Sequence, residues 1–213
     1  WKECEWRLRM PDYPLRDLDW PLWDGRPMGD KILLIHVEQG LGDTLNFVRY
    51  LPDLMDQSEN IIFLVQTPLL RLISYQFRNT KVRVITEHDF PIQFHGRVPL
   101  LGLPYHFKTT LDTIPGEIPY IKSIPSLVEV WQPTFNKNGF KVGLFWEGKS
   151  LHRHDLSRRR ALSLDQFAPL AKLENVIFYS LQVGDPAKQI LSTPYGMEVI
   201  DLGTKLTDFA ETS

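Results

Sequence analysis

The stretch Glu38-Gln39-Gly40-Leu41-Gly42-Asp43 lies between an apolar run, Ile32–Val37, and an amphipathic run, Thr44–Asp56. The apolar run is short, nearly continuous and rich in branched residues, which predicts a buried parallel strand. The amphipathic run carries its large apolar residues at helical spacing, which predicts a helix. Strand, glycine-rich turn and helix in this order are typical of an open α/β sheet, in which ligands bind beyond the carboxyl ends of the strands. The sequence therefore predicts a ligand-facing turn at this point.

The residue types of this turn suggest its chemistry. Gly40 and Gly42 allow the backbone either to approach a ligand closely or to adopt a positive φ. Asp43 stands at the expected start of the helix, where a carboxylate is either an N-cap or a catalytic base. The third glycine of a dinucleotide fingerprint is missing, so no pyrophosphate is expected here. His36 and His95, on expected strands, are interpreted as hydrogen-bonded core histidines rather than catalysts.

The whole chain limits the class of protein. Its 213 residues, 43% of them apolar, suit one large domain or two small ones, and its net charge of −2 argues against nucleic-acid binding. The single cysteine, Cys4, cannot form a disulfide within one chain, and no apolar run reaches the roughly 20 residues that span a bilayer. No signal peptide is visible, so we expect a cytoplasmic protein. Because the sequence does not begin with Met, we expect it to be a piece of a longer protein.

The order of expected elements divides the chain into four segments. Residues 1–28 are a Trp- and Pro-rich arm that either wraps the following domain or packs against a preceding one. Residues 29–124 alternate as βαβ units do and predict a Rossmann-like domain. Residues 125–139 form a linker, and residues 140–213 begin a second Rossmann-like domain that stops inside a helix. The other expected strands are 60–65, 81–85, 94–100, 120–121, 141–146, 176–181 and 197–202, and the other expected helices are 68–77, 102–107, 126–131, 164–173 and 186–191.

A second candidate site is the polar loop 148–160, which follows a buried strand. It gathers basic side chains in a chain of negative net charge, and guanidinium groups bind phosphate in a planar, bidentate way. The loop is either a phosphate site or a solvated basic loop. His152, His154 and Asp155 do not complete a tetrahedral ligand set, so no metal site is predicted. The basic residues of the loop are Lys149, Arg153, Arg158, Arg159 and Arg160.

The segment 33–52, with the Glu-Gln-Gly-Leu-Gly-Asp turn as its most specific part, resembles the start of a known domain. This is the glycosyltransferase domain of bacterial tetratricopeptide-repeat proteins, which is similar to the heptosyltransferases of lipopolysaccharide synthesis. Trp1, Glu5, Trp6 and Arg7 are similar to the junction after the helical repeats of that family. The resemblance covers nearly the whole chain, and its further matches are Val98–Pro104, Ile114–Pro115, Pro119–Tyr120, Val142–Gly148, Ser180–Gln182, Asp201–Gly203 and Leu206–Phe209.

The resemblance implies an α/β, GT-B-like fold of two Rossmann-like domains, the second incomplete. It implies that the first domain holds the acceptor and that Asp43 is the general base on the acceptor hydroxyl. Gln39, Gly40 and Gly42 would then form the acceptor-side loop around this base.

The resemblance also implies a nucleotide-sugar donor on the second domain. Arg160 is the best match to the basic residue that contacts the donor phosphates, although that family tends to have Lys there, and Arg159 and Lys149 lie in the same loop. The implied reaction is an inverting transfer that needs no metal and no further cofactor, because arginines neutralise the departing diphosphate.

One departure from the family leaves two interpretations open. The family pattern continues beyond Ser213 with a segment that cradles the donor diphosphate, and this segment is absent from the sequence. The chain is therefore either part of an enzyme that transfers a sugar to a hydroxyl of a glycan, lipid or protein, or a non-catalytic binding and scaffold module beside helical repeats that bind protein partners. Fold alone does not separate the two.

Overall fold

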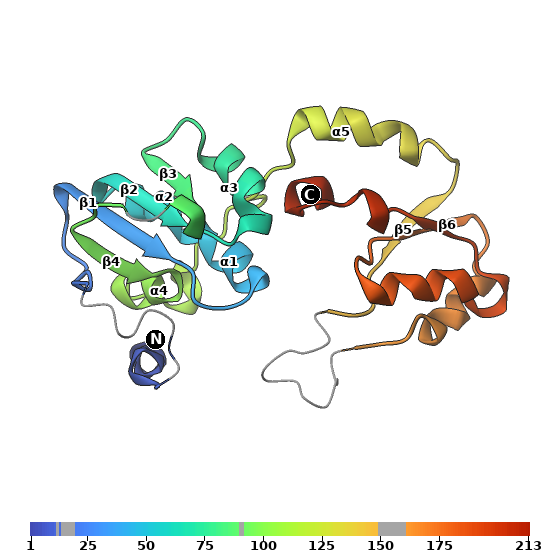
Figure 1. Ribbon diagram of the computed structural model, residues 1–213, viewed down its shortest axis with the longest axis horizontal. Coiled ribbons are helices and arrows are strands. Elements are labelled where there is room, and N and C mark those ends of the chain that lie inside the picture. The colour runs from blue at the N-terminus through green and yellow to red at the C-terminus, as the bar shows by residue number, and fades with distance from the viewer. Residues whose placement is uncertain (12, 14–19, 90–91, 149–160) are drawn as a thin grey trace. The chain divides into compact units, whose positions relative to one another are not determined.

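The computed structural model describes residues 1–11, 13, 20–89, 92–148 and 161–213. These residues form two compact units, Trp1–Ser123 and Ile124–Ser213 (Figure 1). Each unit is built on one sheet, and all the paired strands within the two sheets are parallel. The α/β class expected from the sequence is therefore confirmed.

The sheet of the first unit has the order β3-β2-β1-β4. The chain moves outward from β1 through β2 to β3 and then returns to the other side of β1 to form β4. The strand order thus reverses beside β1, and open α/β sheets bind ligands at such a reversal. The bounds are β1 Gly29–His36, β2 Ser58–Leu64, β3 Val82–Ile85 and β4 Gly96–Pro99.

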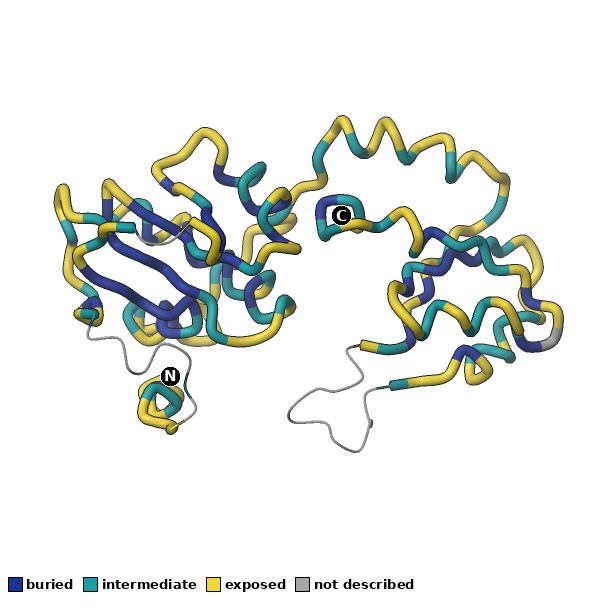
Figure 2. Tube along the Cα trace, in the orientation of Figure 1, coloured by how far each residue is buried: buried dark blue, intermediate teal, exposed yellow. Residues whose placement is uncertain are grey.

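The second half of the central strand β1, Leu33–His36, is buried on both faces (Figure 2). Leu33, Leu34 and Ile35 are fully inaccessible to solvent, as is Phe63 on the neighbouring strand β2. Burying one such side chain contributes about 1.5–3 kcal/mol relative to leaving it exposed. The continuous apolar run in the sequence therefore reflects a strand covered on both sides.

The helix expected at residues 44–56 is divided into three shorter segments. α1 spans Leu41–Phe47, the 3₁₀ helix η2 spans Val48–Tyr50, and α2 spans Leu51–Met55. Pro52 lies in the first turn of α2 and has no N–H to donate to the preceding turn, which explains the interruption. Since α1 begins at Leu41, the turn before it is shorter than the sequence suggests.

The other helical segments of the first unit are short. Pro68 lies near the start of the segment that contains η3 and α3, as expected for a residue without an N–H. The bounds are η1 Lys2–Arg9, η3 Thr67–Leu69, α3 Leu70–Phe77, η4 Glu87–Asp89, η5 Leu100–Gly102, α4 Leu103–His106 and η6 Leu111–Thr113.

The strand expected at 120–121 is wrong. Pro115 and Pro119 lack the N–H groups that a sheet ladder needs. The Arg49 guanidinium lies 4.1 Å from the centroid of the Tyr120 ring and donates a hydrogen bond to the Pro115 carbonyl at 3.3 Å. The segment thus packs on a helical side chain instead of joining the sheet.

The N-terminal arm contacts the first unit. Trp23 is 5% exposed, and its Nε1 donates to the carbonyl of Arg26 at 2.7 Å. Trp1 donates from Nε1 to the Thr109 carbonyl at 2.8 Å, and Leu22 forms a parallel bridge with Arg97. Of the two interpretations of the arm, these contacts support the one in which it wraps the domain that follows.

The second unit has a sheet of order β5-β6-β7, with β5 Phe140–Leu144, β6 Val176–Ser180 and β7 Val199–Asp201. Its core gathers Leu144, Trp146, Leu164, Phe178 and Met197. The helix expected at 164–173 is the 3₁₀ helix η8, Leu164–Lys172, with Pro169 inside it. The other helices are α5 Pro125–Trp131, η7 Gln132–Phe135, η9 Asp185–Ser192, η10 Pro194–Gly196, η11 Gly203–Lys205 and α6 Phe209–Thr212.

The strand expected at 94–100 is shorter in the structure, because only Gly96–Pro99 pair with β1. No helix within the described ranges has the length and apolar character that a membrane span requires.

Candidate functional site

Asp43 lies in the turn that follows β1, at the third position of α1. Its Oδ2 accepts a hydrogen bond from the Gly40 N–H at 2.9 Å, so the carboxylate reaches back over the start of the helix. Gly40 is therefore the N-cap, and the N-cap interpretation of Asp43 is wrong by three positions. Asp43 is half-buried, and its Oδ1 makes no hydrogen bond with any described residue. This oxygen is available to take a proton from a ligand.

The two glycines of the turn have different roles. Gly40 has φ −71° and ψ 168°, and Gly42 is not among the positive-φ glycines, so the positive-φ interpretation is wrong for both. A Cβ on Gly40 would lie 3.3 Å from the Asp43 Oδ2, whereas a Cβ on Gly42 would meet no atom within 4 Å. Gly40 thus leaves room for the returning carboxylate, and Gly42 leaves an open surface beside it.

Gln66, just beyond β2, holds the turn from one side. Its Nε2 donates to the carbonyl of Gln39 at 3.0 Å, and its Oε1 accepts from the Thr44 hydroxyl at 3.0 Å. Thr44 is buried, with 1% of its surface exposed. One amide therefore links the end of β2 to the residues on both sides of the helix start.

Arg7, from the N-terminal helix η1, holds the turn through Glu38. The Nε and Nη2 of Arg7 lie 2.9 Å and 2.7 Å from the Glu38 Oε1. The Glu38 side chain is 1% exposed and that of Arg7 is 15% exposed, so this is a buried ion pair. The other carboxylate oxygen of Glu38, Oε2, is buried, and no described residue makes a hydrogen bond of standard geometry to it. The Tyr13 hydroxyl lies near this carboxylate, because burial and then the charge of Glu38 raise the pKa of Tyr13.

His36, the last residue of β1, lies beneath the turn and is fully buried. Its Nε2 lies 3.2 Å from the Nη1 of Arg97, which can only donate, so Nε2 accepts and the ring proton sits on Nδ1 facing the Val37 carbonyl. Burial, followed by the charge of Arg97, lowers the pKa of His36 to about 4. The ring is neutral at neutral pH, which confirms its interpretation as a core histidine. The same interpretation is wrong for His95, which is exposed and precedes β4, although its Nδ1 accepts a hydrogen bond from the Ile32 N–H at 3.0 Å.

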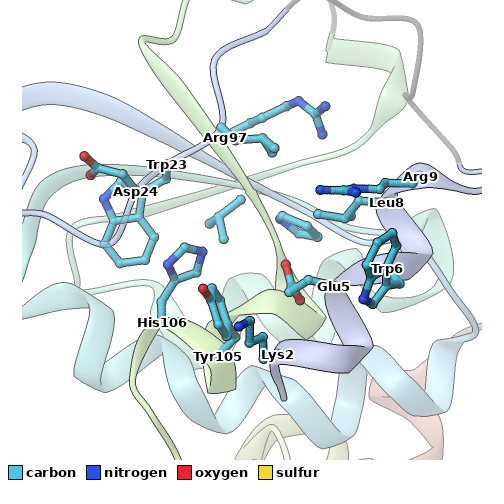
Figure 3. A pocket seen from close by; sticks show the side chains of 13 residues that line it. Lys2, Glu5, Trp6, Leu8, Arg9, Trp23, Asp24, Arg97, Tyr105 and His106 are labelled. Atoms are coloured by element: carbon cyan, nitrogen blue, oxygen red, sulfur yellow. The ribbon is translucent and has the colours of Figure 1, made fainter.

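The first unit also contains a cavity of about 450 Å³. Its walls come from η1, the N-terminal arm, β4 and α4, and Figure 3 shows the side chains of Glu5, Tyr105 and His106 projecting toward the same space. The His106 ring lies 4.8 Å from that of Trp23, and burial is the main cause that lowers the pKa of His106. The lining combines aromatic rings with charged groups, which suits a polar ligand with an apolar face.

The expected donor-side residues Lys149, Arg159 and Arg160 lie outside the described residues. The expected acceptor-side residues Asp43, Gln39, Gly40 and Gly42 lie together in the turn after β1. His152, His154 and Asp155 also lie outside the described ranges, and within those ranges no three His, Cys, Asp or Glu side chains gather in a way that could hold a metal ion.

The backbone that follows β5 is anchored by Gln182. Its Oε1 accepts from the N–H groups of Trp146 at 3.1 Å and Glu147 at 3.0 Å. Its Nε2 donates to the carbonyls of Glu147 at 2.8 Å and Val183 at 3.1 Å. The side chain is 2% exposed, so a fully satisfied buried amide fixes the backbone after β5.

Arg7, Gln66 and Gln182 were not predicted as site residues. A sequence signal exists for the two glutamines, because each follows a buried apolar strand directly, where polar side chains reach the ligand edge of a sheet. Arg7 has no such signal, since its partner Glu38 is far away in the sequence and in another segment.

No family model matches the sequence, and no solved structure matches it. Protein FlbA of Caulobacter vibrioides is 27% identical over an alignment of 239 residues, which covers 99% of this chain and 39% of FlbA. The chain thus spans about two fifths of the length of this curated relative, whose name states no activity.

Proposed function

We propose that this chain is a GT-B-like domain of a glycosyltransferase that moves a sugar from a nucleotide-sugar to a hydroxyl group. The first unit would hold the acceptor, and the second would hold the donor. The acceptor would be a glycan, lipid or protein hydroxyl, and neighbouring tetratricopeptide repeats would recruit protein partners. The proposal rests on the resemblance of the sequence together with the geometry of the turn after β1.

The observation that carries the proposal is the state of the Asp43 carboxylate. One oxygen is fixed by the Gly40 N–H, and the other makes no hydrogen bond with the part of the chain that the structure describes and lies next to the open surface above Gly42. The turn lies where the strand order reverses, which is the usual ligand site of such a sheet. A fixed carboxylate with one free oxygen at this position has the properties that a general base needs.

The proposed reaction is a single displacement. The acceptor oxygen forms a bond to the anomeric carbon, the bond from that carbon to the diphosphate oxygen breaks, and the configuration inverts. Asp43 takes the proton of the acceptor hydroxyl. Arg160, with Arg159 and Lys149, would stabilise the negative charge that develops on the nucleoside diphosphate, so no metal is needed.

The test of this role is Asp43→Asn, compared with Asp53→Asn, which removes an exposed carboxylate on α2. Release of nucleoside diphosphate would be measured with UDP-, GDP- and ADP-sugars. Loss of a general base costs about 10²–10⁴ in rate, so we expect that loss in Asp43→Asn with nucleotide binding unchanged. Equal rates in Asp43→Asn and the parent chain would remove the assignment.

A second candidate is a binding module without catalysis, and the cavity of the first unit favours it. Trp6 is 59% exposed at its rim, and the Arg9 guanidinium lies 4.3 Å from the Trp6 ring centroid. Aromatic and cationic groups that converge on one cavity can bind a ligand with no help from Asp43. Binding of an acceptor-type ligand without any release of nucleoside diphosphate would support this alternative.

A further inference from the structure

We propose that Arg7 and Glu38 are positioning residues that connect the N-terminal helix η1 to the turn that carries Asp43. The catalytic meaning of this tether rests on the proposed function, but the tether itself does not. The ion pair joins residues 31 positions apart, so it fixes the turn from outside the local sequence. No residue of the pair is proposed to touch the reacting atoms.

The position of Glu38 explains how the tether reaches Asp43. Glu38, Gln39 and Gly40 are consecutive, and each is held by a side chain from a different element. Arg7 of η1 binds the Glu38 carboxylate, Gln66 beyond β2 binds the Gln39 carbonyl, and the Asp43 carboxylate binds the Gly40 N–H. A shift of Glu38 is therefore passed along two peptide bonds to the group that orients Asp43.

The geometry of the pair indicates positioning rather than stability. The Nε and Nη2 of Arg7 bind the same oxygen, Oε1, whereas its Nη1 binds Glu5 within η1 at 2.6 Å. No described residue makes a hydrogen bond to the buried Oε2 of Glu38. A buried ion pair that leaves a carboxylate oxygen unsatisfied is a weak source of stability, because desolvation opposes the Coulomb attraction. Apolar residues would fill this space with a smaller desolvation penalty. A hydrogen-bonded ion pair, in contrast, fixes the distance and the direction between Arg7 and Glu38.

Because Arg7 lies on η1, the ion pair makes the turn sensitive to the position of that helix. Arg7 belongs to η1, whose residues also line the cavity of the first unit. Any ligand or protein segment that displaces η1 would release Glu38 and loosen the turn. The tether thus makes the orientation of Asp43 depend on how η1 is seated.

The test uses amide hydrogen exchange in the 213-residue chain. Glu38→Gln keeps the shape of the side chain and removes its charge, and Arg7→Lys keeps the charge but offers a single donor group. The matched control is Glu59→Gln, which removes the acid of the exposed Lys81–Glu59 pair at 2.8 Å in the same unit. Exchange is followed at residues 38–44 and, separately, along β2.

A charge-assisted hydrogen bond is strong enough that its loss should speed exchange of the turn amides about tenfold in Glu38→Gln. We expect a smaller increase in Arg7→Lys, no change in Glu59→Gln, and unchanged exchange along β2 in all three. At the turn amides the double variant Arg7→Lys/Glu38→Gln should exchange no faster than Glu38→Gln, because the two changes share the Arg7–Glu38 contact and the other partners of Arg7, Glu5 and Cys4, lie within η1. Unchanged turn amides, or a parallel rise along β2, would overturn the proposal.

Sugar transfer gives a separate readout. In Glu38→Gln we expect kcat to fall while the KM for the donor stays the same, because only the acceptor-side base is disturbed. If the parent chain releases no nucleoside diphosphate, the proposed function fails, and the exchange experiment still decides whether the tether exists. If transfer occurs and kcat does not change in Glu38→Gln, the positioning role is refuted.

Discussion

The ends of β1 and β5, the first strands of the two units, are held by the same device. His36 pairs with Leu64, and Leu144 pairs with Ser180. Gln66 follows Leu64 by two positions, and its Nε2 donates to the carbonyl of Gln39, the third residue after β1. Gln182 likewise follows Ser180 by two positions, and its Nε2 donates to the carbonyl of Glu147, the third residue after β5. These bonds join Gln66 to Gln39 at 3.0 Å and Gln182 to Glu147 at 2.8 Å.

The surroundings of the two glutamines differ. Gln66 is half-buried and binds a single backbone group, while Asp43 and Arg7 provide further anchors for the same turn. Gln182 is buried and binds four backbone groups by itself. In the first unit, side chains from several elements thus hold the turn after the strand. In the second unit, the Gln182 side chain makes the corresponding contacts by itself.

This difference predicts unequal losses when each amide is removed. Gln182→Leu removes the partner of the buried Trp146 N–H and of the half-buried N–H and C=O of Glu147, at about 1–3 kcal/mol for a buried group and less for a half-buried one, so we expect local stability to fall by about 3 kcal/mol. Gln66→Leu should cost about 1 kcal/mol, because the remaining anchors keep the turn in place. Native-state hydrogen exchange of β6 and β2 measures the two values, and an equal or reversed order would break the comparison.

A smaller effect is expected from acid, and only in the first unit. The unfolded-state pKa of a histidine is about 6.5, and the pKa of buried His36 is about 4, so protons bind the unfolded chain first. The stabilisation is complete above the unfolded value and is lost as the pH falls toward the folded value. Between pH 7 and pH 5 the loss should be about 2 kcal/mol.

The control for this effect is His36→Gln, which does not titrate and can still accept a hydrogen bond from Arg97. Exchange of β2 amides at pH 7 and pH 5, corrected for intrinsic rates, should show a weaker pH dependence in the variant than in the parent chain. The same pH dependence in both would show that other groups are responsible. The amides of β6 provide an internal reference, because His36 belongs to the first unit.

Part of this arrangement can be predicted from the sequence. The apolar run of β1 and the following glycines predict a turn at the ligand edge of a sheet, and the structure has such a turn. The position of Asp43 was predicted incorrectly, because a residue at the third helical position can satisfy the N-cap N–H as well as an N-cap side chain can.

The rest depends on contacts between segments. The Arg7–Glu38 pair and the amides of Gln66 and Gln182 join residues that no local pattern connects. The strand expected at 120–121 failed for a related reason, since its prolines and the stack on Arg49 outweigh a weak local preference. Periodicity therefore predicts the elements of this chain, and tertiary polar contacts determine how its turns are held.

The most direct test of the proposed transferase is calorimetric titration of the chain with UDP, GDP and ADP. We expect that one nucleotide binds, that Arg160→Ala abolishes this binding because it removes a phosphate contact, and that Asp43→Asn leaves the binding unchanged. The two variants thus separate the donor side from the acceptor side. Absence of binding by all three nucleotides, or binding that survives Arg160→Ala and is lost in Asp43→Asn, would contradict the account.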